Sequence, residues 1–168
     1  MSENSFDLTT RSVDDTVHLG ETLGRLLQSG DVLCLSGELG AGKTTLTRGM
    51  AQGWGAREHA TSPTFTLVNE YTRTGDEQRF YHMDGYRLSG AVEAQTTAFE
   101  DIVDAPGVVV IEWPERIAGI LPEERLWVDI ARTGEDQRTF TLRPSGERAE
   151  ELARALAAHH ASTGEPSP

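Results

Sequence analysis

The segment Gly37-Glu38-Leu39-Gly40-Ala41-Gly42-Lys43-Thr44 is the most informative part of the sequence, and it directly follows the apolar run Val32-Leu33-Cys34-Leu35. Its pattern, G-x-x-x-x-G-K-[ST], is that of the P-loop, in which glycines let backbone N–H groups turn inward around the phosphates of a nucleotide. Lys43 is the only lysine among 168 residues, although lysine and arginine together number 15. A compact ammonium on a flexible stem suits this position better than a planar guanidinium does. We therefore interpret the segment as a nucleotide-binding loop.

The residues around this loop have the order that a P-loop requires. Residues 31–36 are predicted to form a short buried strand, and residues 44–52 a helix whose N-terminus points at the phosphates. The hydroxyl of Thr44 would be a ligand for Mg²⁺. Further along the chain, we expect the following elements: a strand at 6–10, a helix capped by Ser12 and running to 28, a β-hairpin of 65–72 and 78–83, a helix at 91–103, a buried strand at 108–111, a second hairpin of 126–132 and 138–143, and a helix at 147–160.

Length and charge limit the classes of function. A chain of 168 residues suits one domain, which we place at 1–160, followed by a disordered tail at 161–168. The net charge of −12 argues against an extended basic face that would bind nucleic acid directly. A single cysteine excludes an intramolecular disulfide, and no apolar stretch is long enough for a membrane span, so we expect a cytoplasmic protein. No histidine has the spacing of a zinc site.

Two carboxylates are candidates for the chemistry of hydrolysis. Glu112 follows the apolar run at 108–111, and Asp84 follows the strand predicted at 78–83. Ligands of α/β proteins collect at the carboxyl edge of the sheet, where a P-loop NTPase needs an acidic residue to hold Mg²⁺ or water. The same pattern also occurs at ordinary surface positions. Thr64 is either a switch residue that senses the γ-phosphate or part of a turn that starts a strand, and both interpretations stay open.

Four motifs in order resemble those of the TsaE family, also called YjeE: Gly37 to Thr45, Ser62-Pro63-Thr64-Phe65-Thr66-Leu67-Val68, His82-Met83-Asp84-Gly85-Tyr86-Arg87-Leu88 and Ile111-Glu112-Trp113-Pro114-Glu115. The resemblance covers roughly residues 10 to 145. It implies an α/β fold of the P-loop NTPase class, with a central parallel sheet flanked by antiparallel strands or hairpins and with helices on both faces.

The resemblance also implies a function. Proteins of this family are ATPases of tRNA threonylcarbamoyladenosine (t6A) biosynthesis, which modifies the adenosine beside the anticodon in tRNAs that read codons beginning with A. The implied partners are TsaB and TsaD, so that tRNA would be contacted only indirectly. The implied cofactors are ATP and Mg²⁺, and hydrolysis is expected to be weak without the partners.

Motif positions assign roles to individual residues. Lys43 would hold the phosphates, Thr44 and Glu112 would hold Mg²⁺, Asp84 would order the catalytic centre and contribute to the metal site, and Thr64 would be a switch residue. The residues expected to contact the nucleotide are Glu38, Leu39, Gly40, Ala41, Gly42, Lys43, Thr44, Thr45, Trp113 and Arg138.

Two other functions fit the P-loop. A small-molecule kinase would have a suitable length, but the chain has no clustered arginine segment between 90 and 145 that would form a lid over the phosphates. A non-catalytic, ATP-gated binding module is disfavoured by the presence of both Asp84 and Glu112. GTP is disfavoured as the nucleotide, because no second lysine exists to build the N-K-x-D motif that reads guanine.

Overall fold

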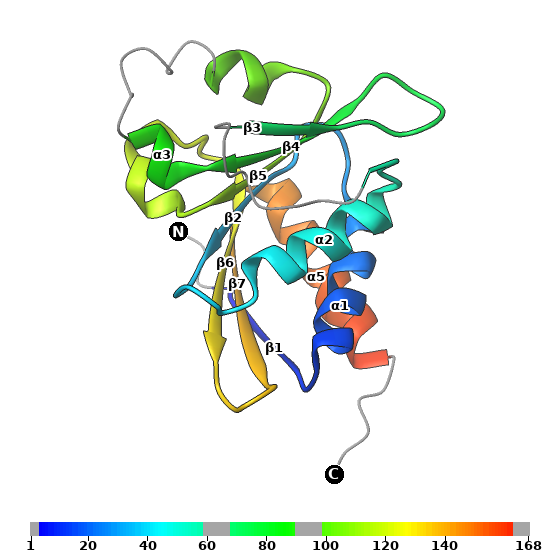
Figure 1. Ribbon diagram of the computed structural model, residues 1–168, viewed down its shortest axis with the longest axis vertical. Helices are drawn as coiled ribbons and strands as arrows, with labels where there is room; N and C mark the ends of the chain where they lie inside the picture. The colour runs from blue at the N-terminus through cyan, green and yellow to red at the C-terminus, as the bar shows by residue number, and fades with distance from the viewer. Residues whose placement is uncertain (1–3, 59–67, 90–98, 163–168) are drawn as a thin grey trace.

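The computed structural model describes residues 4–58, 68–89 and 99–162, which form a mixed seven-stranded sheet with helices on both faces (Figure 1). The strand order is β1-β7-β6-β2-β5-β4-β3. The central strands β6, β2, β5 and β4 are parallel, whereas β3 pairs with β4, β7 with β6 and β1 with β7 in antiparallel fashion. The predicted fold class, a parallel centre with antiparallel flanks, is therefore confirmed.

The predicted elements lie close to their expected positions, and the short helices at Gly85–Ser89 and Pro114–Ile120 were not predicted. The strands are β1 (Phe6–Thr10), β2 (Val32–Ser36), β3 (Val68–Tyr71), β4 (Arg79–Asp84), β5 (Gly107–Glu112), β6 (Arg125–Arg132) and β7 (Arg138–Ser145). The helices are α1 (Val13–Leu26), α2 (Lys43–Trp54), α3 (Gly85–Ser89), the 3-10 helix η1 (Pro114–Ile120) and α5 (Glu147–Ser162), and residues 99–104 are helical as well.

Some predicted boundaries were wrong by a few residues. Helix α1 ends at Leu26 rather than at 28, because Leu27 has an extended backbone (φ −69°, ψ 143°). Helix α5 continues to Ser162, so Ala161 and Ser162 are helical and 163–168 lie outside the described residues. The first residues of two predicted elements, at 65–67 and 91–98, also lie outside the described residues. No helix in the described parts of the chain is long and apolar enough to cross a membrane.

Alternating side chains of the central strands form a core on each face of the sheet. Leu33 and Leu35 of β2 pack into a cluster with α1, α2 and α5, whereas Val32 and Cys34 pack into a second cluster that includes Phe99. These four of the five β2 side chains are buried, as expected for a parallel strand covered on both sides. The apolar run before the P-loop therefore anchors the loop in the middle of the protein.

Helices α1 and α2 pack at very short range through glycines. Gly20 and Gly24 on α1 face Gly49 and Gly53 on α2, and a Cβ built on any of the four would overlap backbone atoms of the other helix. Because α2 begins at the P-loop lysine, this backbone-to-backbone contact helps to determine where the loop lies relative to the sheet.

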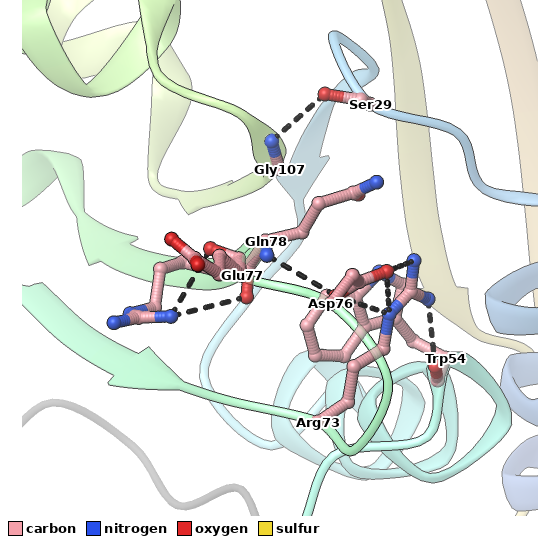
Figure 2. Close-up of polar contacts among 8 residues, drawn as sticks. Ser29, Trp54, Arg73, Asp76, Glu77, Gln78 and Gly107 are labelled. Atoms are coloured by element: carbon pink, nitrogen blue, oxygen red, sulfur yellow. Dashed lines mark hydrogen bonds and ion pairs between the residues drawn. The ribbon is translucent and has the colours of Figure 1, made fainter.

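The β3–β4 hairpin is attached to the C-terminal end of α2 by Arg73 (Figure 2). Its guanidinium lies over the ring of Trp54, 4.3 Å from the centroid, and donates to the Trp54 carbonyl oxygen at 3.0 Å. Asp76 accepts three further hydrogen bonds from Arg73, at 3.2, 3.0 and 2.7 Å. The helix that starts at the P-loop is thus held at both ends, by β2 and by this hairpin.

Candidate functional site

The P-loop connects β2 to α2, and two of its glycines have left-handed backbones. Gly40 has φ 81° and Gly42 has φ 116°, values that disfavour any residue with a Cβ. Lys43 is the first residue of α2, and its Nζ donates to the carbonyl oxygens of Gly37 and of Glu38, the latter at 3.1 Å. The lysine side chain is therefore folded back over its own loop.

One pocket of about 390 Å³ brings together most of the predicted site residues. It lies where the P-loop meets the carboxyl ends of β4 and β5, as ligand sites of α/β sheets commonly do. Its lining residues are Leu39, Gly40, Gly42, Lys43, Thr44, Thr45, Asp84, Arg87, Glu112, Trp113 and Arg138.

Of the remaining predicted residues, two do not line this pocket and one lies outside the described residues, whereas one residue that was not predicted does line it. Glu38 and Ala41 do not line the pocket but contribute backbone carbonyls to the loop, which accept from Lys43 and Arg138 respectively. Thr64 lies outside the described residues. Arg87 was missed by the sequence reasoning; it lines the pocket and lies 3.6 Å from Asp84.

Asp84 and Glu112 are the last residues of two neighbouring parallel strands and lie opposite each other in the register of β4 and β5. Asp84 Oδ1 accepts the backbone N–H of Tyr86 at 2.9 Å, so this carboxylate also caps the start of α3. Glu112 is almost completely buried, with 8% of its surface exposed. Both carboxylates line the same pocket as the hydroxyl-bearing Thr44.

These oxygen ligands fit Mg²⁺, which prefers carboxylates and hydroxyls and usually binds through one or two protein ligands together with phosphates. Within the described ranges, no three His, Cys, Asp or Glu side chains are grouped so that they could enclose a metal by themselves. The chemistry of the pocket therefore suits a metal that arrives together with a nucleotide.

His82 is a second residue that the sequence reasoning did not assign to the site. It is fully buried, and its Nε2 lies 2.6 Å from Glu112 Oε2. The signal was present in the sequence, because His82 and Asp84 are two residues apart on one strand and must therefore face the same side of the sheet.

Burial and nearby charges change the pKa of Lys43 in opposite directions. Burial lowers the pKa of its ammonium, and the negative charges of Glu112, Glu115 and Asp84 partly offset this effect. The same carboxylates would repel an anion, so a phosphate group would bind here together with a cation such as Mg²⁺.

Trp113 covers the lysine from the side of β5. Its ring centroid lies 4.3 Å from Lys43 Nζ, and Tyr86 packs edge-on against the same ring. Among the described residues, Trp113 is the only one other than glycine with a positive φ (56°). A left-handed tryptophan costs about 1 kcal/mol or more, and strain of this kind is frequently located at functional sites.

Arg138 approaches the loop from the start of β7. Its Nε donates to the carbonyl oxygen of Ala41 at 2.8 Å, and the side chain lies beside Gly42. The structure thus places this predicted residue at the P-loop, 97 positions away from Ala41 in the sequence.

In this protein a buried parallel strand enters a glycine-rich loop, a lysine begins the next helix, and an acidic residue ends the neighbouring strand. This arrangement defines a nucleotide-binding protein of the P-loop class. The protein-family model described as "Threonylcarbamoyl adenosine biosynthesis protein TsaE" matches residues 10–140 of this chain. The chain therefore belongs to the TsaE family, as its motifs predicted.

Individual relatives agree with this assignment. The chain is 42% identical over 134 residues to the tRNA threonylcarbamoyladenosine biosynthesis protein TsaE of Streptomyces coelicolor, an alignment that covers 77% of this chain and 90% of the relative. It is 37% identical over 150 residues to the protein of the same name from Bacillus subtilis, with 89% and 92% covered. The crystal structure of Bacillus subtilis YdiB is similar to the whole fold, with a TM-score of 0.73, 36% identity and coverage of 93% of this chain and 96% of that one.

Proposed function

We propose that this chain is a Mg²⁺-dependent ATPase that serves the threonylcarbamoyl modification of the adenosine beside the anticodon in tRNAs reading codons that begin with A. The observation that carries the proposal is a single pocket in which Lys43 at the start of α2 meets the carboxylates of Asp84 and Glu112. The names of the relatives, which are tRNA threonylcarbamoyladenosine biosynthesis proteins, support the pathway.

The residues of the pocket have complementary roles in this proposal. Lys43 exchanges the carbonyl oxygens of Gly37 and Glu38 for phosphate oxygens, and the N–H groups at the start of α2 bind the same phosphates. Thr44 and Glu112 hold Mg²⁺, Asp84 contributes to the same site, and Arg138 supports the loop from the side. Mg²⁺, when bound, neutralises charge that develops on the transferred phosphoryl group.

The surface charge supports a role within a larger assembly. With a net charge of −12, the chain has no surplus of basic residues to bind tRNA over a wide area. We propose that TsaB and TsaD are its partners, that they carry the contact with tRNA, and that hydrolysis in the cytoplasm resets the state of their complex. Thr64 would act as a switch residue in that cycle.

Phosphate release from ATP tests the proposal, measured with the chain alone and with TsaB and TsaD added. We expect weak release that requires Mg²⁺ and rises when both partners are present. The Glu112→Gln variant should still bind ATP but lose the stimulated release, while Glu123→Gln, a change at an exposed position, should behave as the wild type. Transfer of phosphate to a small metabolite, without stimulation by the partners, would instead identify a kinase.

A further inference from the structure

Glu112 does not stand alone at the end of β5, because a buried histidine from the neighbouring strand contacts it. We propose that His82 is a positioning residue for Glu112: it engages Oε2 and thereby leaves Oε1 as the oxygen that binds Mg²⁺ in the nucleotide pocket. This inference rests on the proposed function, since it needs Glu112 to be a metal ligand.

The backbone explains why the two side chains meet. In the register of β4 and β5, His82 lies opposite Val110 and Asp84 lies opposite Glu112. Val110 and Phe80 belong to the core cluster beneath α2, so the alternation of both strands directs His82 and Glu112 to that same face. The pair therefore joins two neighbouring central strands across one face of the sheet, and the hydrogen bonds between the strands hold both backbones in place.

The direction of the hydrogen bond follows from the chemistry of the groups. An ionised carboxylate has only acceptors, so a bond of 2.6 Å requires the proton to be on Nε2 of His82. The histidine side chain is 0% exposed and the glutamate side chain 10%, so water competes weakly for this bond. One carboxylate oxygen is thus held in a fixed place, and the orientation of the other is fixed with it.

Asp84 provides a contrast within the same pocket. Its side chain is 18% exposed, and its orientation is set by a backbone N–H from the adjacent helix α3 and by Arg87. Local chain geometry therefore orients Asp84, whereas Glu112 depends on a side chain from a different strand. Hydrogen-bond partners of metal ligands typically change metal affinity or activity by about 10- to 100-fold when they are removed.

The test compares variants that keep or remove the donor at the Nε2 position. The amide nitrogen of His82→Gln reaches that position, the shorter His82→Asn does not, and His82→Leu removes the donor. The affinity of a fluorescent ATP analogue is measured with Mg²⁺ and with EDTA, and the ratio of the two affinities is the gain due to Mg²⁺. The exposed His18→Gln is a matched control, and thermal unfolding reports on folding.

We expect His82→Leu and His82→Asn to lower the gain due to Mg²⁺ by about 10- to 100-fold while the affinity in EDTA stays within about 2-fold of the wild type. His82→Gln should retain most of the gain, and in the steady state the loss should appear mainly as a higher concentration of Mg²⁺ required for half-maximal rate. If His82→Leu does not fold, the difference between the glutamine and asparagine variants decides the question.

Two failures can be told apart with Glu112→Gln. If Glu112→Gln loses the gain due to Mg²⁺ but His82→Leu and His82→Asn both keep it, the positioning role is wrong and the proposed function stands. If Glu112→Gln keeps the gain, Glu112 is not a metal ligand, and the inference falls together with that part of the proposed site.

Discussion

The ammonium of Lys43 lies 4.3 Å from the ring centroid of Trp113, while the same ammonium donates to carbonyl oxygens of its own loop. These carbonyl groups are ones that the lysine would have to release in order to bind phosphate, as we propose it does. A cation over an indole ring is stabilised by about 0.5–2 kcal/mol, and this contact links the aromatic side chain after β5 directly to the state of the P-loop.

Trp113 should report nucleotide binding through its fluorescence. Movement of the Lys43 charge away from the ring, and entry of a nucleotide beside it, both change the environment of the indole. We expect ATP to change the emission of the wild type, Trp113→Phe to abolish that change, and Trp127→Phe to preserve it. Undiminished change in Trp113→Phe would show that the signal comes from another tryptophan and that Trp113 does not report nucleotide binding.

Lys43→Arg should weaken ATP binding strongly even though it keeps the positive charge. Lys43 is 6% exposed, and its compact head fits between the carbonyls of Gly37 and Glu38 and the ring of Trp113. A wider guanidinium cannot occupy that space without moving the loop. Hydrogen bonds to charged groups contribute about 1.5–3 kcal/mol, so we expect a loss of at least about 10-fold in affinity by calorimetry. Binding equal to that of the wild type would refute this account of the lysine.

The sequence predicted those parts of the site that depend on local order along the chain. The P-loop pattern predicted the place of Lys43, and an acid directly after a buried strand indicated Glu112. Arg87 was not predicted, because its place in the pocket depends on how α3 leaves β4. His82 was predictable in principle, since alternation along one strand places it on the face of Asp84, but only pairing of β4 with β5 brings it to Glu112.

The contact between α1 and α2 could likewise be predicted only in part from the sequence. Gly20 and Gly24, like Gly49 and Gly53, are four residues apart and so lie on one face of their helix. This spacing permits a close approach, but the sequence does not say which helices approach each other.

Gly49→Ala should destabilise the fold and weaken nucleotide binding together. Its new Cβ would overlap the carbonyl oxygen of Val17, so α1 and α2 would have to separate and the P-loop would move with α2. Overpacking of this kind typically costs about 1–3 kcal/mol in the free energy of unfolding. Urea denaturation and ATP titration measure the two effects. Gly119→Ala is the control, because a Cβ there would meet nothing within 4 Å. Equal stability and equal ATP affinity of the two variants would contradict the close packing of α1 against α2.

Cys34 should make the stability of the protein fall at alkaline pH. Burial raises the pKa of this thiol from 9.0 to about 12, an effect that the charge of Arg125 only partly offsets. Below pH 9 the thiol is protonated in both states, but above it the unfolded chain loses the proton while the folded chain keeps it. The stabilisation is therefore complete below pH 9 and is lost as the pH rises toward 12, with a loss of about 1.4 kcal/mol at pH 10.

Urea denaturation at pH 7 and pH 10 should show this loss in the wild type and not in Cys34→Ala, because all other groups titrate alike in the two proteins. An equal change in both would mean that the thiol ionises as readily in the folded protein as in the unfolded chain.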